Sequence, residues 1–149
     1  MSDFTIRPAT DADHDAIARV WLDGWLSTGL SNGDDPTPEQ MRERLAADVG
    51  KWSALAVAVS DDRVIGMLAL YPGKLDQLFL APEHKGTGVG KALFAEAKRL
   101  MPDGFTLWAN TANDRARAFY ERHGMDLVEL GPRLDKPEQV VAHYRWTPA

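Results

Sequence analysis

The sequence predicts an α+β fold with a mixed, mostly antiparallel central sheet flanked by helices. Two apolar runs, 54–60 and 64–71, are separated by a short polar stretch that contains Asp61 and Asp62, which is typical of an antiparallel hairpin. Segments with helical periodicity lie on both sides of this hairpin in the chain. A chain of 149 residues with 44% apolar residues is long enough to bury one core, so we expect a single domain over 1–149.

The predicted order of elements is β-α-α-β-β-β-α-β-α-β-β. The expected strands are 3–8, 54–60, 64–71, 75–81, 105–110, 126–130 and 140–146. The expected helices are 11–25, 38–49, 88–101 and 113–122. Loops are expected at 27–37, which is rich in Gly, Ser and Asp, and over a long stretch from about 131 to 139 that contains two prolines.

The first helix has a start signal and an apolar side. Thr10 followed by Asp13 resembles a capping box with Asp in place of Glu. Ile17 and Trp21 share a side at helical spacing and are expected to pack in the core. Trp25 lies at the end of the helix, where it either continues this side or lines a pocket for a substrate.

Composition excludes several classes of function. The chain has no cysteine, so a thiolate nucleophile and a thiolate metal site are both excluded, and its four scattered histidines show no ligand spacing. We therefore expect no metal. A net charge of -5 argues against sequence-independent binding to nucleic acid. No apolar run approaches the length of a membrane span and no signal-peptide pattern opens the chain, so we expect a cytoplasmic protein without a membrane partner.

The most informative stretch is the glycine-rich segment from Lys85 to Gly90, which follows a strand and opens a helix. Backbone N–H groups of such a turn, together with those at a helix N-terminus, form a site for phosphate oxygens. A Walker A loop is excluded because Lys91 is followed by Ala92 rather than Ser or Thr. A dinucleotide fingerprint is excluded because the glycines alternate evenly.

This segment resembles the coenzyme A loop of the GNAT superfamily of N-acetyltransferases, Gln/Arg-x-x-Gly-x-Gly/Ala, with Lys85 at the Gln/Arg position. Lysine keeps the positive charge and loses the planar fork of arginine. A second block, 113–125, resembles the family's Asn-x-x-Ala-x-x-Phe-Tyr-Glu-x-x-Gly-Phe pattern, with Met125 at the last position. The resemblance implies acetyl-CoA as co-substrate and a sheet whose fourth and fifth strands splay apart.

The resemblance also implies roles for individual residues. The backbone N–H near Leu80 polarises the acetyl carbonyl, although Leu78 and Leu80 also fit core packing. Tyr120 is the candidate general acid for the departing thiolate, whereas Phe119 is expected to pack. Asn113 is expected either to bind the pantetheine arm or to cap a helix. The residues expected to bind acetyl-CoA are Leu78, Phe79, Leu80, Lys85, Gly86, Thr87, Gly88, Val89, Gly90, Lys91, Asn113 and Tyr120.

The general base and the acceptor are less defined. Some family members carry a Glu five residues before the motif Asn, but here that position is Trp108, which is either a wall of the acceptor site or a core residue. Asp76 is the candidate base, with water as the alternative carrier of the proton. Asp34 and Asp35 either attract a cationic amine or form a solvated turn.

We expect the acceptor to be a small-molecule amine. The alternatives are a protein amine and, from another class, a non-catalytic acyl-CoA-binding module on the same fold. A homodimer is also possible by analogy with the family, with the strand 140–146 as a pairing edge.

Overall fold

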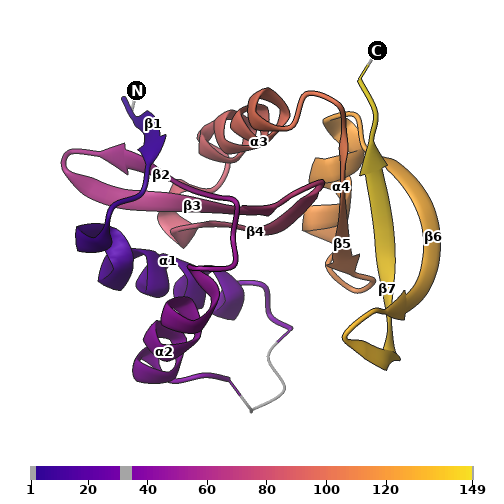
Figure 1. The fold of residues 1–149 in the computed structure, drawn as a ribbon, viewed down its shortest axis with the longest axis horizontal. Coiled ribbons are helices and arrows are strands. Elements are labelled where there is room, and N and C mark those ends of the chain that lie inside the picture. The colour runs from indigo at the N-terminus through magenta and orange to yellow at the C-terminus, as the bar shows by residue number, and fades with distance from the viewer. Residues whose placement is uncertain (1–2, 31–34, 149) are drawn as a thin grey trace. The chain divides into compact units, whose positions relative to one another are not determined.

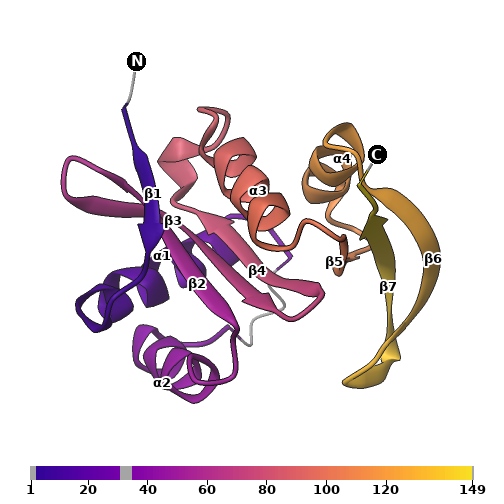
Figure 2. The same cartoon turned by 45° about the horizontal axis from the view of Figure 1, so that its top comes forward.

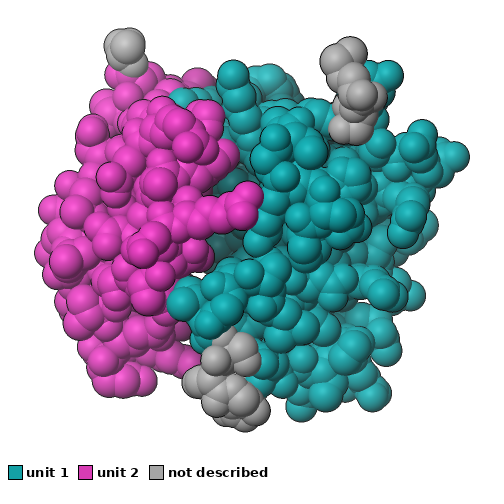
Figure 3. All heavy atoms as spheres, turned by 180° about the vertical axis from the view of Figure 1, so that it is seen from behind, with its two compact units in different colours: residues 1–100 teal, residues 101–149 magenta. Residues whose placement is uncertain are grey.

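The fold was determined as a computed structural model, which describes residues 3–30 and 35–148. These residues form two compact units, 1–100 and 101–149, shown in teal and magenta in Figure 3. Each unit is described by itself below. The expectation of a single domain over 1–149 stays a prediction.

The first unit is built on an antiparallel sheet in the order β1-β2-β3-β4 (Figure 1). Its strands are β1 (Thr5–Pro8), β2 (Ala54–Ser60), β3 (Arg63–Tyr71) and β4 (Lys74–Leu80). Asp61 and Asp62 join β2 to β3 with φ angles of 51° and 62°. Two successive positive φ angles define the type I′ turn, whose twist matches that of a hairpin, so the predicted hairpin is confirmed.

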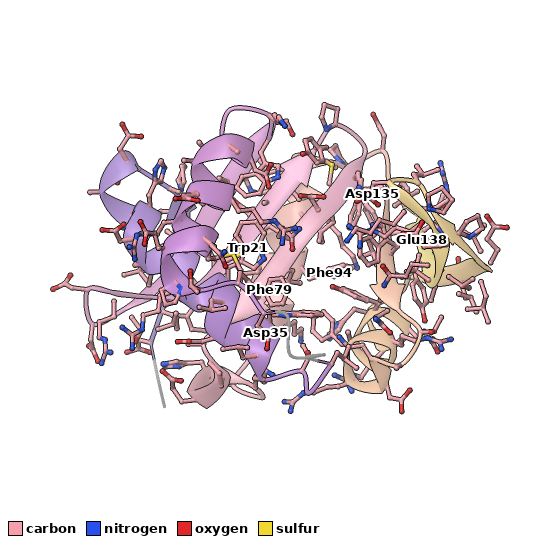
Figure 4. The ribbon with its side chains drawn as sticks, turned by 90° about the horizontal axis from the view of Figure 1, so that it is seen from below. Trp21, Asp35, Phe79, Phe94, Asp135 and Glu138 are labelled. Carbon is pink, nitrogen blue, oxygen red and sulfur yellow. The ribbon has the colours of Figure 1, made fainter. Side chains whose placement is uncertain are left out.

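Helices cover both faces of this sheet. Figure 2 shows α3 (Val89–Leu100) on one face, and α1 (His14–Leu26) and α2 (Pro38–Asp48) on the other. Short 3-10 turns, η1 (Asp11–Asp13) and η2 (Pro82–His84), precede α1 and α3. The core under α1 and α2 contains Trp21 and Ile17 as expected, with Phe79 of β4 packed against it; Figure 4 labels Trp21 and Phe79.

The predicted capping interaction before α1 is part of a larger polar contact. The Asp13 carboxylate accepts a hydrogen bond from the Thr10 backbone N–H at 2.8 Å and two from the Arg7 guanidinium at 2.7 and 3.0 Å. Asp13 is 8% exposed, and its contact with Arg7 holds the pKa of the carboxyl well below its usual range. This contact joins β1 to the start of α1.

The second unit is an antiparallel sheet in the order β5-β7-β6, with one helix between β5 and β6 in the chain. Its elements are β5 (Phe105–Asn110), α4 (Asp114–Arg122), β6 (Asp126–Arg133) and β7 (Lys136–Trp146). The predicted strands and the helix at 113–122 are confirmed at their centres. The long loop expected at 131–139 is wrong, because β6 and β7 continue through it and meet at a tight turn.

Two prolines explain this error. Pro132 lies on β6, which in the described part of this unit pairs with β7 alone, so a missing N–H costs no bond on its outer side. Pro137 lies on the part of β7 that extends past β5, whose last pair is Asn110 with Val141. The strand 140–146 was also expected to be a pairing edge. That expectation is wrong, because β7 lies between β5 and β6.

The α+β class with mostly antiparallel strands is confirmed. The splay expected between the fourth and fifth strands concerns strands of different units and stays a prediction. Within the described ranges, no helix combines the length and apolar character needed to span a membrane.

Candidate functional site

The glycine-rich segment adopts a backbone that requires glycine. Gly86 and Gly88 have φ angles of 80° and 91°, and a Cβ atom added to either would meet nothing within 4 Å. Both residues are exposed. The glycines are therefore needed for conformation rather than for space inside the protein, and they leave the main chain open to a ligand.

The start of α3 adds hydrogen-bond donors to this loop. The first helical bond runs from the Ala92 N–H to the Gly88 carbonyl at 3.0 Å. The N–H groups of Val89, Gly90 and Lys91 precede that bond and project from the helix N-terminus. Donors and a partial positive charge at this point suit phosphate oxygens, so the residues present fit the pyrophosphate of coenzyme A.

Two polar side chains hold the loop in place. The Lys85 ammonium, which is half-buried, donates to the Ser27 hydroxyl at the end of α1. The Thr87 hydroxyl donates to the His84 carbonyl. Lys85 thus connects the loop to α1, and Lys91 is exposed on the first turn of α3.

The backbone of β4 has the direction that acyl binding requires. The Ala81 N–H donates to the Ile65 carbonyl of β3 at 2.9 Å. Because donors alternate along an antiparallel strand, the N–H groups of Leu78 and Leu80 point away from β3. The side chain of Leu80 packs toward α3 and that of Phe79 toward α1. Side-chain packing and main-chain binding are therefore compatible at Leu78 and Leu80.

In the second unit, Asn113 caps α4 and Tyr120 lies in a partly buried place. The Asn113 Oδ1 accepts a hydrogen bond from the Ala116 N–H at 3.2 Å, which leaves the side-chain amide nitrogen outside the cap. The Tyr120 ring lies 5.6 Å from that of Phe119 and 6.2 Å from that of Tyr144. Burial raises the pKa of Tyr120 to about 12. A phenol with this pKa holds its proton at neutral pH, as a general acid must.

A polar cluster around the buried Tyr144, next to Tyr120, was not found from the sequence. The Tyr144 hydroxyl accepts from the Arg117 Nε at 3.0 Å and donates to the Glu121 Oε2 at 2.5 Å. The Tyr144 side chain is fully buried, so the cluster ties α4 to β7. A sequence signal did exist, since Arg117 and Glu121 are four residues apart on one face of a predicted helix.

The candidate base Asp76 is engaged by neighbours in its own unit. The Trp52 Nε1 donates to its Oδ2 at 3.0 Å, and the Lys74 ammonium lies 3.5 Å from its Oδ1. Both carboxylate oxygens therefore have contacts that hold the start of β4. The role of Asp76 as a base stays a prediction.

The two tryptophans expected at the acceptor site both have polar partners. Trp108 lies on the face of β5 opposite to the buried row, with the Arg133 guanidinium 4.5 Å from its ring centre. The Trp25 Nε1 donates to the Asp35 Oδ1 at 3.1 Å; Asp35 is labelled in Figure 4. Asp34 lies outside the described residues. The contact of Trp25 and Trp108 with a substrate stays a prediction.

The predicted residues gather in two groups. The first unit contains the donors of β4, the loop 85–90 and the start of α3 along one continuous segment, with Trp25 at the end of α1. The second unit contains Asn113 and Tyr120 on α4, and Trp108 on β5. In the described part of the chain, no group of three or more acidic or histidine side chains is arranged to hold a metal ion.

Comparison with known proteins gives one family. The sequence profile of the acetyltransferase (GNAT) family matches residues 16–125. The peptidyl-lysine N-acetyltransferase YjaB of Salmonella typhimurium is 37% identical over 87 residues, which are 58% of this chain and 59% of that protein. The chain thus spans less than two thirds of the length of this relative.

Solved structures agree with the fold. The PaiA N-acetyltransferase of Thermoplasma acidophilum, solved in complex with coenzyme A, has a TM-score of 0.75 at 19% identity and covers 97% of this chain and 99% of its own. The apo form of YjaB from Escherichia coli has a TM-score of 0.72 at 24% identity and covers 99% of both chains.

Proposed function

This chain belongs to the acetyltransferase (GNAT) family, and we propose that it transfers the acetyl group of acetyl-CoA to a primary amine by direct attack. The observation that carries the proposal is the continuous segment from Leu78 to Lys91. In that segment the outward N–H groups of Leu78 and Leu80 lead into a loop whose positive φ angles open the main chain to phosphate.

Acetyl-CoA supplies an activated thioester. The Leu80 N–H donates a hydrogen bond to the carbonyl oxygen and stabilises the negative charge that develops there as the amine attacks. The C–N bond forms as the C–S bond breaks, and the Tyr120 hydroxyl gives its proton to the departing sulfur. Such general acid help is worth roughly 10²–10⁴ in rate. A proton leaves the amine through water or through Asp76.

The acceptor is the finer part of the proposal. The name of the YjaB relative points to a lysine side chain in a protein, so a protein amine is the first acceptor to test. A small-molecule amine, as expected from the sequence, is the second. The net charge of -5 suits either, because both acceptors are cationic in water.

The test is release of free thiol from acetyl-CoA with a panel of lysine peptides, folded proteins and small amines. We expect Tyr120→Phe to lower kcat by roughly 10²–10⁴. Tyr71→Phe is the matched control, because it removes one phenol hydroxyl from β3, a strand to which no step of the proposed reaction is assigned. An unchanged kcat in Tyr120→Phe removes the assigned acid. Binding of acetyl-CoA without turnover of any amine favours the non-catalytic module.

A further inference from the structure

The last turn of α1 contains a buried glycine in a helical conformation. Gly24 lies between Asp23 and Trp25, and a glycine inside a helix costs roughly 0.5–1 kcal/mol relative to alanine. Its φ is not positive, so backbone conformation does not require glycine here. The requirement comes from packing.

The helix approaches β4 so closely at this point that a side chain fits only if its neighbours move. A Cβ atom on Gly24 would lie 2.8 Å from Phe79 Cδ1, 3.0 Å from Phe79 Cβ and 3.2 Å from the Leu80 carbonyl oxygen. The Phe79 ring can rotate away from such an atom. The Phe79 Cβ and the Leu80 oxygen are fixed to the strand, so they move only when the backbone moves.

The same turn also contacts two other parts of the proposed site. Ser27 accepts a hydrogen bond from the Lys85 ammonium of the glycine-rich loop. Trp25 donates to Asp35, which follows the loop after α1. The residues from Gly24 to Ser27 therefore contact the carbonyl-binding strand, the phosphate loop and the segment expected to shape the acceptor site.

We propose that Gly24 is a positioning residue that sets the place of the Leu80 backbone, and with it the donor for the acetyl carbonyl. This inference rests on the proposed function. An added Cβ reaches ordinary contact only if its neighbours retreat by 0.2–0.6 Å. The retreat falls on Phe79 and Leu80, because a shift of α1 away from β4 would also pull Ile17 and Trp21, which share the side of Gly24, out of the buried core. A hydrogen bond to a developing oxyanion is sensitive to shifts of this size.

The test compares Gly24→Ala with Gly50→Ala. Gly50 is exposed, its φ is not positive, and a Cβ there meets nothing within 4 Å, so it is a matched control for a glycine replaced by alanine. For Gly24→Ala we expect kcat to fall about tenfold to a hundredfold, with KM for acetyl-CoA within about threefold of the wild type. Gly50→Ala is expected to retain both values.

A second readout does not depend on turnover. In ¹⁵N-labelled wild-type protein, the Leu80 amide resonance is expected to differ between the complexes with CoA and with acetyl-CoA. In Gly24→Ala that difference should disappear while the Gly88 amide still responds to both. If the wild type shows this difference in the Leu80 resonance but acetylates no amine, the proposed function fails. The effect of Gly24→Ala on the Leu80 resonance still tests the role of Gly24.

The inference is overturned if folded Gly24→Ala keeps kcat within about twofold of the wild type, or keeps the Leu80 difference. If Gly24→Ala does not fold, the same change is made in a Phe79→Ala background, which removes the 2.8 Å contact and leaves the contact with the Leu80 oxygen. The double variant must then have a lower kcat than Phe79→Ala alone, and equal values overturn the inference.

Discussion

Replacing Gly88 by alanine tests whether the glycine-rich loop binds coenzyme A through its backbone conformation. Gly88 has a φ of 91°, and the space around it is open, so the substitution adds strain without a clash. A side chain at positive φ costs roughly 1–2 kcal/mol. The free loop of Gly88→Ala is expected to relax into another conformation, which coenzyme A must reverse on binding. The Kd for CoA should then rise about five- to thirtyfold, since 1.4 kcal/mol is tenfold.

Gly73→Ala is the matched control. Gly73 has a φ of 75° and equally open surroundings, but it lies in the turn that precedes β4, at the other end of the strand from Leu80. Titration calorimetry with CoA gives Kd, and urea unfolding gives the stability of each variant. We expect Gly73→Ala to lose stability and keep its Kd. A wild-type Kd in Gly88→Ala, or an equal loss of affinity in Gly73→Ala, would refute the reasoning.

Three further predictions follow from the polar groups. The pKa of Tyr120 is raised to about 12, and a general acid works while it is protonated. The profile of kcat against pH should therefore show no fall caused by Tyr120 below about pH 10. A fall near neutral pH that Tyr120→Phe abolishes would contradict this. Asp13→Asn should lower the free energy of unfolding at pH 7 by about 1–2 kcal/mol, because half-exposed Arg7 loses its partner. Since the pKa of Asp13 is depressed in the folded state, the stability that its carboxylate contributes is present above the unfolded pKa near 4 and is lost as pH falls. Urea titrations should therefore show the difference in free energy of unfolding between the wild type and Asp13→Asn shrinking below about pH 4. A difference independent of pH would exclude ionisation of Asp13 as its cause. Tyr144→Phe should cost about 0.5–1.5 kcal/mol in the same assay, because it removes the hydroxyl through which the buried Tyr144 bonds to Arg117 and Glu121 of α4. An equal loss in Tyr71→Phe would indicate a general effect of losing a phenol.

The parts of the fold that local chemistry determines were predictable from the sequence. Asp61 and Asp62 between two apolar runs predicted the β2–β3 turn, because few residues other than Asp, Asn and Gly tolerate two positive φ angles. The alternating glycines predicted the loop at 85–90 in the same way. The β6–β7 hairpin was missed, because Pro132 and Pro137 indicate a loop unless the outer, unpaired sides of both strands are known.

The candidate site was predictable in its main-chain part and less so in its side-chain part. Motif spacing identified Leu80 and Gly88, whose roles depend on backbone geometry. It did not show that Tyr144 joins α4, because alternation along a strand gives the face of a residue and not its partner across the unit. Gly24 was part of a correctly predicted helix, but its close approach to β4 is a property of packing that no local pattern contains.

If Trp108 forms a wall of the acceptor site, which stays a prediction, the Arg133 guanidinium above its ring affects which amines react. The resemblance places a carboxylate in other family members where this chain has an aromatic ring, and the ring here carries a cation 4.5 Å from its centre. A positive charge near an incoming ammonium favours its neutral form, so we expect the acceptor to react as the free amine. Among acceptors of equal fit, those with the lowest ammonium pKa should then be acetylated fastest at neutral pH, and the rate with a lysine acceptor should rise with pH toward about 10.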